Sequence, residues 1–291
     1  RTAHQRSWYR LPRLGLWRSS LAATPTPSTP PAAAGSMGLS SSDDERAACT
    51  AEFIGTFYLV LTIALTVTQS SPLAPVAIGM MLTAMVFASA PASGGHFNPA
   101  VTFGIWLSGR RPVAAMRVAR YVAVQCLGAL LAGALSSHLL GATVALGPGE
   151  GYTRTDAAIV ETIFSAALVF VVLNTATLAR AFQPSHSDDF AGLAIGFMLL
   201  AGAFAVGPVS GCALNPAAAV GLALPHAIRS GTVAGLGLLP LYVLGPLAGA
   251  LLAAGVFRYV VRPSGYSEAA LGAESACAKK AEQDRREYEA G

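Results

Sequence analysis

Charged residues are scarce in this sequence, and long stretches have none. Asp, Glu, Lys and Arg make up 12% of the chain, about half their share in a typical soluble domain. None of the four occurs in residues 53–109, 190–228 or 230–257. A charge-free apolar run of about 20 residues is already long enough to cross a bilayer as a helix. The sequence therefore excludes an ordinary soluble domain and predicts an integral, multi-pass membrane protein.

The sequence also lacks the residue clusters that metal binding or catalysis requires. Its four cysteines do not have the spacing of a metal site; they are Cys49, Cys126, Cys212 and Cys277. We find no constellation of acid, base and nucleophile of the kind that marks an active site. The pI near 9.0 reflects basic residues that border apolar segments, and in membrane proteins such residues report topology. We therefore expect no enzyme activity, no cofactor, no metal and no nucleic-acid partner.

The two ends of the chain differ in composition from its centre. Residues 1–42 contain five Arg and no acidic residue, which fits an organellar transit peptide or a translated upstream region before Met37. Read from Met37, the segment MGLSSS matches the myristoylation pattern at Gly38. Disorder is the simplest interpretation of this composition. The expected organisation is a disordered segment over 1–47, a membrane domain over 48–262 and a flexible cytoplasmic tail over 263–291.

Six apolar segments are long enough to span a membrane, and the last three repeat the first three. They cover about residues 48–70, 74–92, 113–140, 156–180, 190–207 and 232–260. Asn98 and Asn215 lie 117 positions apart, and the same shift relates Gly79 to Gly196. Three spans is an odd number, so the second copy enters the membrane from the opposite side. Such an inverted repeat places its functional site near the bilayer midplane, between the two halves.

Basic residues predict the orientation of the spans. If the N-terminus lies in the cytoplasm, only Arg154 and Arg229 among the basic residues of the membrane domain and tail face the other side. This bias agrees with the excess of Lys and Arg found in cytoplasmic loops. We therefore expect both termini in the cytoplasm, and the choice between the plasma membrane and an organelle membrane stays open.

Two related stretches, SGGHFNPAVTFG at residues 93–104 and SGCALNPAAAVGLAL at residues 210–224, carry the triplet Asn-Pro-Ala. Asn favours the cap of a helix and Pro favours its first position, while Gly109 and Pro225 are suitable stops. About ten residues between cap and stop give a helix of roughly 15 Å, half of the hydrocarbon thickness. Each stretch therefore predicts a re-entrant half-helix. Two half-helices that meet cap to cap complete a seventh, broken span around a polar path.

The chemistry of that path favours neutral solutes that form hydrogen bonds. The N-terminus of each half-helix carries a partial positive charge of roughly +0.5, which repels cations. The side-chain amides of Asn98 and Asn215 can donate hydrogen bonds into the path, and a water held by donors at the centre cannot easily relay a proton. The expected pore-lining residues are Asn98, Pro99, Ala100, Asn215, Pro216 and Ala217.

Two Asn-Pro-Ala triplets at matching places of an inverted six-span repeat resemble the aquaporin, or major intrinsic protein, family over about residues 48–262. The resemblance implies an all-α membrane protein with six transmembrane helices and two re-entrant half-helices, arranged as an hourglass channel. It also implies a homotetramer in membrane lipid, with one pore per subunit. By the same resemblance Glu52 and Glu161 support the re-entrant loops by accepting backbone N–H groups, and His96 is a loop-packing residue.

The sequence departs from the family pattern at the four positions that form the narrowest point. Counted from the two motifs, these positions are Ile78, Ala203, Cys212 and Ala218. Water channels of the family usually have an aromatic residue at the first, His at the second and Arg at the fourth, and only Cys212 matches. Losing the Arg removes a fixed charge and a rigid set of donors, and the small neighbours predict room for an Arg at position 218. The glycerol-conducting branch usually has Asp after that Arg, where this chain has Ala219.

These departures predict an atypical member that conducts water and slightly larger neutral solutes, such as ammonia, hydrogen peroxide or small polyols. Pore diameter, lining donors and electrostatic barriers set selectivity in channels generally. The alternative is a poorly conducting member of the family with a structural or adhesive role in the membrane.

Overall fold

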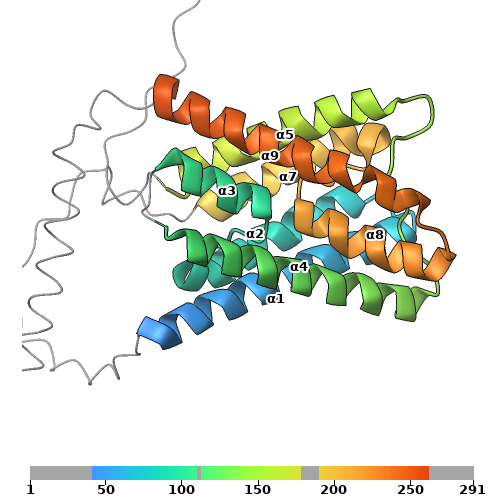
Figure 1. The fold of residues 1–291 in the computed structure, drawn as a ribbon, viewed down its shortest axis with the longest axis horizontal. Helices are drawn as coiled ribbons and strands as arrows, with labels where there is room; N and C mark the ends of the chain where they lie inside the picture. The colour runs from blue at the N-terminus through green and yellow to red at the C-terminus, as the bar shows by residue number, and fades with distance from the viewer. Residues whose placement is uncertain (1–40, 110–112, 178–189, 262–291) are drawn as a thin grey trace, which may run out of the picture. The chain divides into compact units, whose positions relative to one another are not determined.

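The computed structural model describes residues 41–109, 113–177 and 190–261, and in these ranges every regular element is a helix (Figure 1). In chain order the elements are α1 (Ser41–Thr68), α2 (Ala74–Ser93), α3 (Pro99–Ser108), α4 (Ala115–Leu140), α5 (Arg154–Thr175), α7 (Ala191–Ser210), α8 (Pro216–Ser230), the short 3-10 helix η2 (Ala234–Leu238), α9 (Leu239–Val256) and the π-helical turn η3 (Phe257–Val261). Six of the described segments are long and apolar enough to cross a membrane. The expected fold, with six spanning helices and two half-helices, is confirmed.

Some expectations concern parts of the chain outside the described residues. These are the transit-peptide or upstream-translation reading of the first 40 residues, the myristoylation pattern at Gly38, the tail from residue 263 and the position of Cys277. Within the described part, α1 begins at Ser41, seven residues before the expected start of the membrane domain. Asp43 and Asp44 lie in its first turn, where negative charge offsets the partial positive charge of a helix N-terminus.

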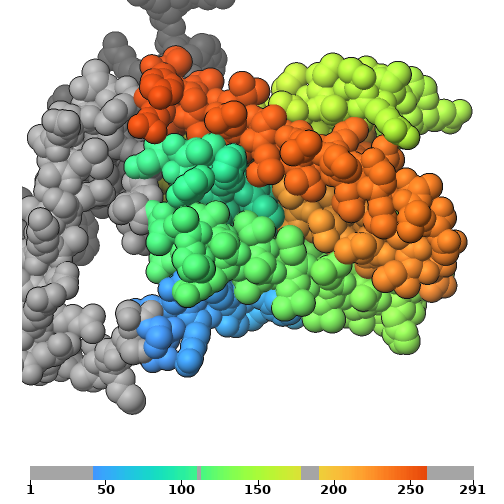
Figure 2. All heavy atoms as spheres, in the orientation of Figure 1, coloured from blue at the N-terminus to red at the C-terminus, as the bar shows by residue number. Residues whose placement is uncertain are grey.

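The two repeats pack in the same way, and the half-helix of each repeat packs against helices of the other. Helices α1, α2, α3 and α4 correspond to α5, α7, α8 and α9. Helix α1 packs on α4 and α2 as α5 packs on α9 and α7, and α3 packs on α5 and α9 as α8 packs on α1 and α4. On the face shown in Figure 2, the atoms of α3 are packed between those of α9 and α4. This exchange places the start of each half-helix between the two repeats.

The two repeats meet directly where α2 crosses α7, and glycine permits the close approach. A Cβ atom on Gly79 would lie 2.7 Å from the carbonyl oxygen of Gly196, and one on Gly196 would lie 2.4 Å from the oxygen of Gly79. In a membrane such contacts between backbones supply much of the helix packing. These two glycines are the pair related by the 117-residue shift, so the crossing lies on the pseudo-symmetry axis of the repeat.

The second half-helix is longer than expected. Helix α3 ends at Gly109 as predicted, but α8 continues through Pro225 to Ser230 and ends before Gly231. The ring of Pro225 removes the N–H that would bond the carbonyl of Gly221. That carbonyl instead lies against Gly133 of α4, at a distance where a Cβ atom on Gly133 would be only 1.9 Å from the oxygen. The missing side chain of Gly133 gives the freed carbonyl its space, so Pro225 does not end the helix.

The outer faces of the spanning helices are apolar. Exposed large hydrophobic residues on them include Ile54, Tyr58, Met80, Phe87, Leu127, Leu131, Ile159, Ile163, Phe197, Leu251 and Leu252. An apolar surface of this extent is rare on soluble monomers. It matches the hydrocarbon interior of a bilayer, in which helices satisfy their backbone groups internally.

We predict that Gly196→Ala destabilises the protein by about 1–3 kcal/mol, because overpacking a closed helix contact costs that much. The new methyl group would lie within 1.9 Å of Thr83 Oγ1 as well as close to the Gly79 carbonyl. Thermal unfolding of the purified protein in detergent measures the effect. Gly255→Ala is the matched control, because a Cβ there meets nothing within 4 Å; equal midpoints for the two variants would contradict the prediction.

Candidate functional site

The two half-helices begin at asparagine caps that face each other inside the protein. Asn98 Oδ1 accepts the backbone N–H of Ala100 at 2.8 Å, and Asn215 Oδ1 accepts those of Ala217 at 2.9 Å and Ala218 at 3.3 Å. In both caps Pro occupies the first helical turn. The caps orient each side chain so that its oxygen faces its own helix and its NH2 group faces away from it.

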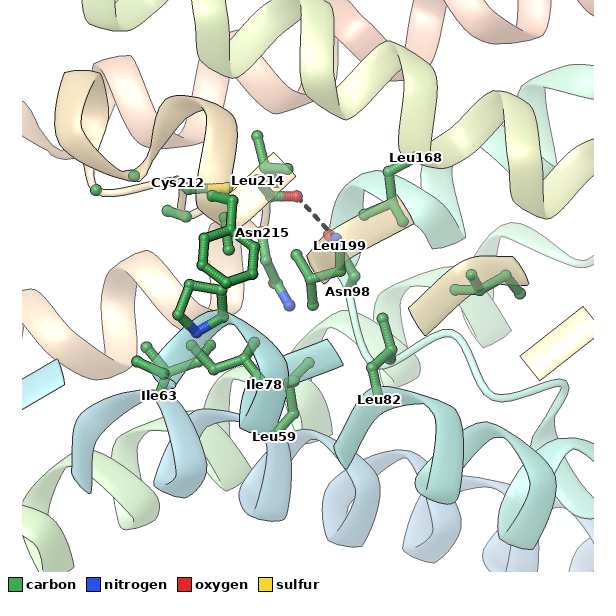
Figure 3. A pocket seen from close by; sticks show the side chains of 18 of the residues that line it. Leu59, Ile63, Ile78, Leu82, Asn98, Leu168, Leu199, Cys212, Leu214 and Asn215 are labelled. Atoms are coloured by element: carbon green, nitrogen blue, oxygen red, sulfur yellow. Dashed lines mark hydrogen bonds between the residues drawn. The ribbon is translucent and has the colours of Figure 1, made fainter. Parts of the chain in front are cut away.

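Each asparagine amide then donates to the loop of the other repeat. Asn98 Nδ2 donates to the carbonyl oxygen of Leu214 at 2.8 Å (Figure 3), and Asn215 Nδ2 donates to that of Phe97 at 2.9 Å. Phe97 and Leu214 directly precede the two asparagines, so the contact is reciprocal. One N–H of each amide is used in this bond, and both asparagines also line the adjoining cavity.

Two carboxylates buried at membrane depth hold the loops that lead into the caps. Glu52 of α1 accepts the backbone N–H groups of His96 at 2.9 Å and Phe97 at 2.7 Å. Glu161 of α5 accepts those of two loop residues, Ala213 at 2.9 Å and Leu214 at 2.7 Å. A buried carboxylate is costly unless donors satisfy it, and charge-assisted bonds of this kind are the strong ones. Each glutamate therefore fixes two consecutive peptide groups of one loop.

The carboxylates compensate for backbone strain. Phe97 has φ +49° and Leu214 has φ +46°, a left-handed conformation that large side chains rarely adopt. A residue held there costs on the order of 1–3 kcal/mol and persists only where its surroundings impose it. Here the N–H of each residue bonds a glutamate and its carbonyl bonds the opposite asparagine. This left-handed conformation also directs the side chain of the following Asn toward the other loop.

Further polar residues that the sequence reasoning missed complete each carboxylate site. Gln125 of α4 donates from Nε2 to Glu52 Oε2 at 2.8 Å, and the Ser210 hydroxyl donates to Glu161 Oε1 at 2.7 Å. Gln125 is the signal that the sequence offers, because it is the one amide side chain in the apolar stretch 121–135, and the structure buries it fully. Each carboxylate thus accepts hydrogen bonds from three donors, and the side chain that supplies the third donor differs between the two repeats.

Two tyrosines hold the ends of the helices that precede the loops. The Tyr121 hydroxyl donates to the Ser93 carbonyl at 2.9 Å, and the Tyr242 hydroxyl donates to the Ser210 carbonyl at 2.6 Å. The last carbonyls of a helix have no partner within it, so these bonds satisfy the final carbonyls of α2 and α7, which end at the left-handed Gly94 and Gly211. The tyrosines lie 121 positions apart, so aligning the two halves at the 117-residue shift does not pair them.

His96 packs within the loop and also reaches the pocket. Its Nδ1 lies 3.1 Å from the hydroxyl of Thr102, and its ring meets that of Tyr121 edge-on at 5.3 Å between centroids. The same side chain is one of those that line the pocket next to Asn98.

A cavity of about 350 Å³ runs past both asparagines. Figure 3 shows Asn98 and Asn215 between apolar walls, with Cys212, Ile63 and Ile78 toward one end and Leu82 and Leu168 toward the other. Other residues that line it include Leu59, Val67, Pro72, Pro75, Ala203 and Phe204. Leu59, Ile63 and Val67 repeat at every fourth position of α1, a helical stripe that the sequence reasoning did not assign to the pore.

Three of the four expected filter residues line this cavity, and Ala218 does not. Ile78, Ala203 and Cys212 are part of its wall. Ala218 is 0% exposed and packs in a cluster with Val60 of α1, among other residues. The room expected at position 218 is therefore absent, because α1 fills it. That packing is a long-range contact between α1 and α8, which the spacing of the motifs does not reveal.

Of the six triplet residues expected to line the pore, two lie in the wall of this cavity and four are buried beside it. Asn98 and Asn215 line the cavity, whereas Pro99, Ala100, Pro216 and Ala217 are buried against neighbouring helices. The prolines and alanines form the first turn of each half-helix, and their side chains project sideways from the helix rather than along its axis. They shape the helix start, and the asparagines supply the chemistry.

Comparison with known proteins gives a consistent result. The family model described as major intrinsic protein matches residues 38–259. "Probable aquaporin PIP-type pTOM75" of Solanum lycopersicum is 34% identical over 196 residues, covering 64% of this chain and 65% of that protein, slightly under two thirds of its length. "Aquaporin PIP2-7" of Arabidopsis thaliana is 32% identical over 252 residues, covering 81% of this chain and 88% of that protein. The "X-ray structure of the aquaglyceroporin from Plasmodium falciparum" matches with a TM-score of 0.65 at 20% identity, covering 75% of this chain and 98% of that chain, which shows a shared fold.

We predict that Glu161→Gln frees the loop at residues 211–215. An amide offers one acceptor oxygen, so either Ala213 or Leu214 loses its N–H partner, at a cost of about 1–3 kcal/mol. Hydrogen–deuterium exchange followed by mass spectrometry should show faster exchange in this loop, with residues 95–98 unchanged. The exposed Glu150→Gln is the control; a loop as protected in Glu161→Gln as in that control would refute the supporting role.

Proposed function

The chain belongs to the major intrinsic protein family, and on that premise we propose that it conducts water together with small neutral solutes such as ammonia, hydrogen peroxide and small polyols. Membership itself makes the chain an integral, multi-pass membrane channel for water or small solutes and not an enzyme. The names of the relatives, aquaporin and aquaglyceroporin, support both water and larger neutral solutes as cargo.

The observation that carries the proposal is a cavity with hydrogen-bond donors at its centre and no charged residue in its described wall. The two amides of Asn98 and Asn215 supply the donors, and Asp, Glu, Lys and Arg are absent from its described lining. A neutral solute can exchange its water shell for these donors. An ion cannot, because an isolated charge in apolar surroundings is very costly and two helix N-termini add a positive potential that repels cations.

Orientation and assembly follow as part of the same proposal. At the end of the bundle where α1 begins lie Arg46, Arg117, Arg120 and Arg258, and at the other end lie Arg154 and Arg229 (Figure 1). This distribution supports cytoplasmic termini by the excess of basic residues on that side. The homotetramer usual in the family is the proposed assembly.

Osmotic shrinkage of liposomes that contain the purified protein tests the proposed function. We expect water efflux well above that of protein-free liposomes, and partial re-swelling when urea or a small polyol is the osmolyte. Shrinkage no faster than in protein-free liposomes would contradict the proposal and favour a structural or adhesive role.

We predict that Asn215→Asp makes the channel leak cations. The aspartate cannot donate to the Phe97 carbonyl, and it places a full negative charge against two helix N-termini that otherwise repel cations. Sodium flux into proteoliposomes should rise by about an order of magnitude, since such charges set pore selectivity. Asn174→Asp is the control, because Asn174 bonds its own helix at Phe170. A folded variant that is as impermeable to sodium as the parent would show that Asn215 does not form the barrier to cations.

We predict that a mercurial slows permeation by reacting with Cys212, whose thiol lines the cavity. The residue precedes Asn215 by three positions on non-helical backbone, so a bulky adduct narrows the path. Cys212→Ser should conduct normally and lose the sensitivity in the same stopped-flow assay. Unchanged inhibition of the Ser variant would assign the sensitive thiol to another cysteine of the chain.

A further inference from the structure

Ala218 stands where water channels of the family usually have Arg, and helix α1 packs beside it. Ala218 is in the first turn of α8, and its cluster contains Val60 and Ala64 of α1, with Ala129 of α4 nearby in the same group. All of these side chains are buried. The space beside Ala218 is therefore occupied by α1, and not open to the cavity.

Ile63 is the residue of α1 that connects this cluster to the cavity. It is partly buried, packs against the cluster that holds Ala218, and also packs against the core cluster that holds Ile78 and Cys212. It lines the cavity itself, and Figure 3 places it beside Ile78 at the end of the cavity that contains Cys212. Ile63 therefore borders both the cluster that holds Ala218 and the solute path.

The part of the cavity around Ile63 is poor in hydrogen-bonding groups. We call it the α1–α2 end, because Val67, Pro72 and Pro75 line it where α1 leads into α2. Among the described side chains lining this end, the polar one is the thiol of Cys212, a weak donor and acceptor. Other contacts with a solute there come from backbone and apolar carbon. The amides of Asn98 and Asn215 lie farther into the cavity than this end.

We propose that Ile63 sets solute selectivity at the α1–α2 end, favouring small, weakly hydrated neutral solutes of the ammonia type over solutes that are more strongly hydrogen-bonded to water, such as water itself and urea. This inference rests on the proposed function and names the residue and the solute class at the same site. Each hydrogen bond that a solute gives up without replacement adds to its barrier. A solute with few such bonds therefore loses least at an apolar constriction, and a bulky polar solute loses most.

Ile63→Thr tests polarity, and Ile63→Val is its control for size, because threonine has the shape of valine and both lack the δ-methyl group of isoleucine. Threonine keeps the β-branch, and its hydroxyl can bond the carbonyl of Leu59, as Thr56, Thr62 and Thr66 do four residues back in the same helix. The hydroxyl also offers a passing water one partner. We expect the ratio of water to ammonia permeability to rise about fivefold, equivalent to about 1 kcal/mol of barrier. Ile54→Thr, on the exposed face of α1, is the matched control.

The measurement uses full-length protein in liposomes of one lipid composition. Light scattering after an osmotic step reports water, and an internal pH-sensitive dye reports ammonia entry from an ammonium chloride gradient. The inference is supported if the ratio in Ile63→Thr rises above that in Ile63→Val and the ratio in Ile54→Thr stays at the parent value. It is overturned if the parent conducts and Ile63→Thr has the same ratio as Ile63→Val, a result that leaves the proposed function intact. If the parent is as impermeable as protein-free liposomes to both solutes, the proposed function and this inference are both wrong.

If Ile63→Thr does not fold, a double substitution at positions 63 and 218 tests the inference instead. Ala218→Arg alone should give little folded protein, because its side chain enters a filled cluster. In Ile63→Ala/Ala218→Arg the vacated space opens toward the cavity, so the yield of folded protein should recover and urea permeability should fall relative to water. If the double variant folds no better than Ala218→Arg, Ile63 does not occupy that space and the inference fails.

Discussion

The structure depends on two buried carboxylates, each of which holds two consecutive peptide N–H groups of a re-entrant loop. Non-helical backbone at membrane depth is tolerated only where its polar groups find partners in protein or water. Glu52 and Glu161 supply those partners, and they make it possible for Phe97 and Leu214 to remain in a left-handed conformation. That conformation turns each following asparagine toward the opposite loop. The caps, the half-helices and the central donors all follow from this contact.

The site divides into a centre that is strongly constrained and an end that is not. At the centre, the side-chain hydrogen bonds of the two asparagines within the described residues go to their own helix caps and to the opposite loop, so changing one group disturbs both repeats. At the α1–α2 end the wall is made of separate apolar side chains from α1, α2 and α7. Such a wall can change one residue at a time while the centre stays intact. This separation explains how a chain can keep both motifs and still lack the Arg usual after the second one.

The sequence predicts well whatever depends on local pattern or on the repeat. Charge-free runs mark the spans, the 117-residue shift marks the repeat, and Asn followed by Pro marks the two helix starts. The six apolar helices, the matching packing of the two halves and the starts of α3 and α8 agree with these three patterns. The sequence predicts poorly what depends on contacts between distant helices. Helix α8 passes Pro225 because Gly133 makes room for a carbonyl, and Ala218 is buried because α1 packs over it. Neither contact has a signal within its own segment.

The central claim is that the paired asparagine caps form a path for neutral solutes that excludes protons. Measuring water flux and the decay of an imposed pH gradient on the same proteoliposomes tests it most directly. The structure predicts water flux well above that of protein-free liposomes, with a pH gradient that decays no faster than in them. Faster decay of the pH gradient, in step with the amount of reconstituted protein, would contradict the claim.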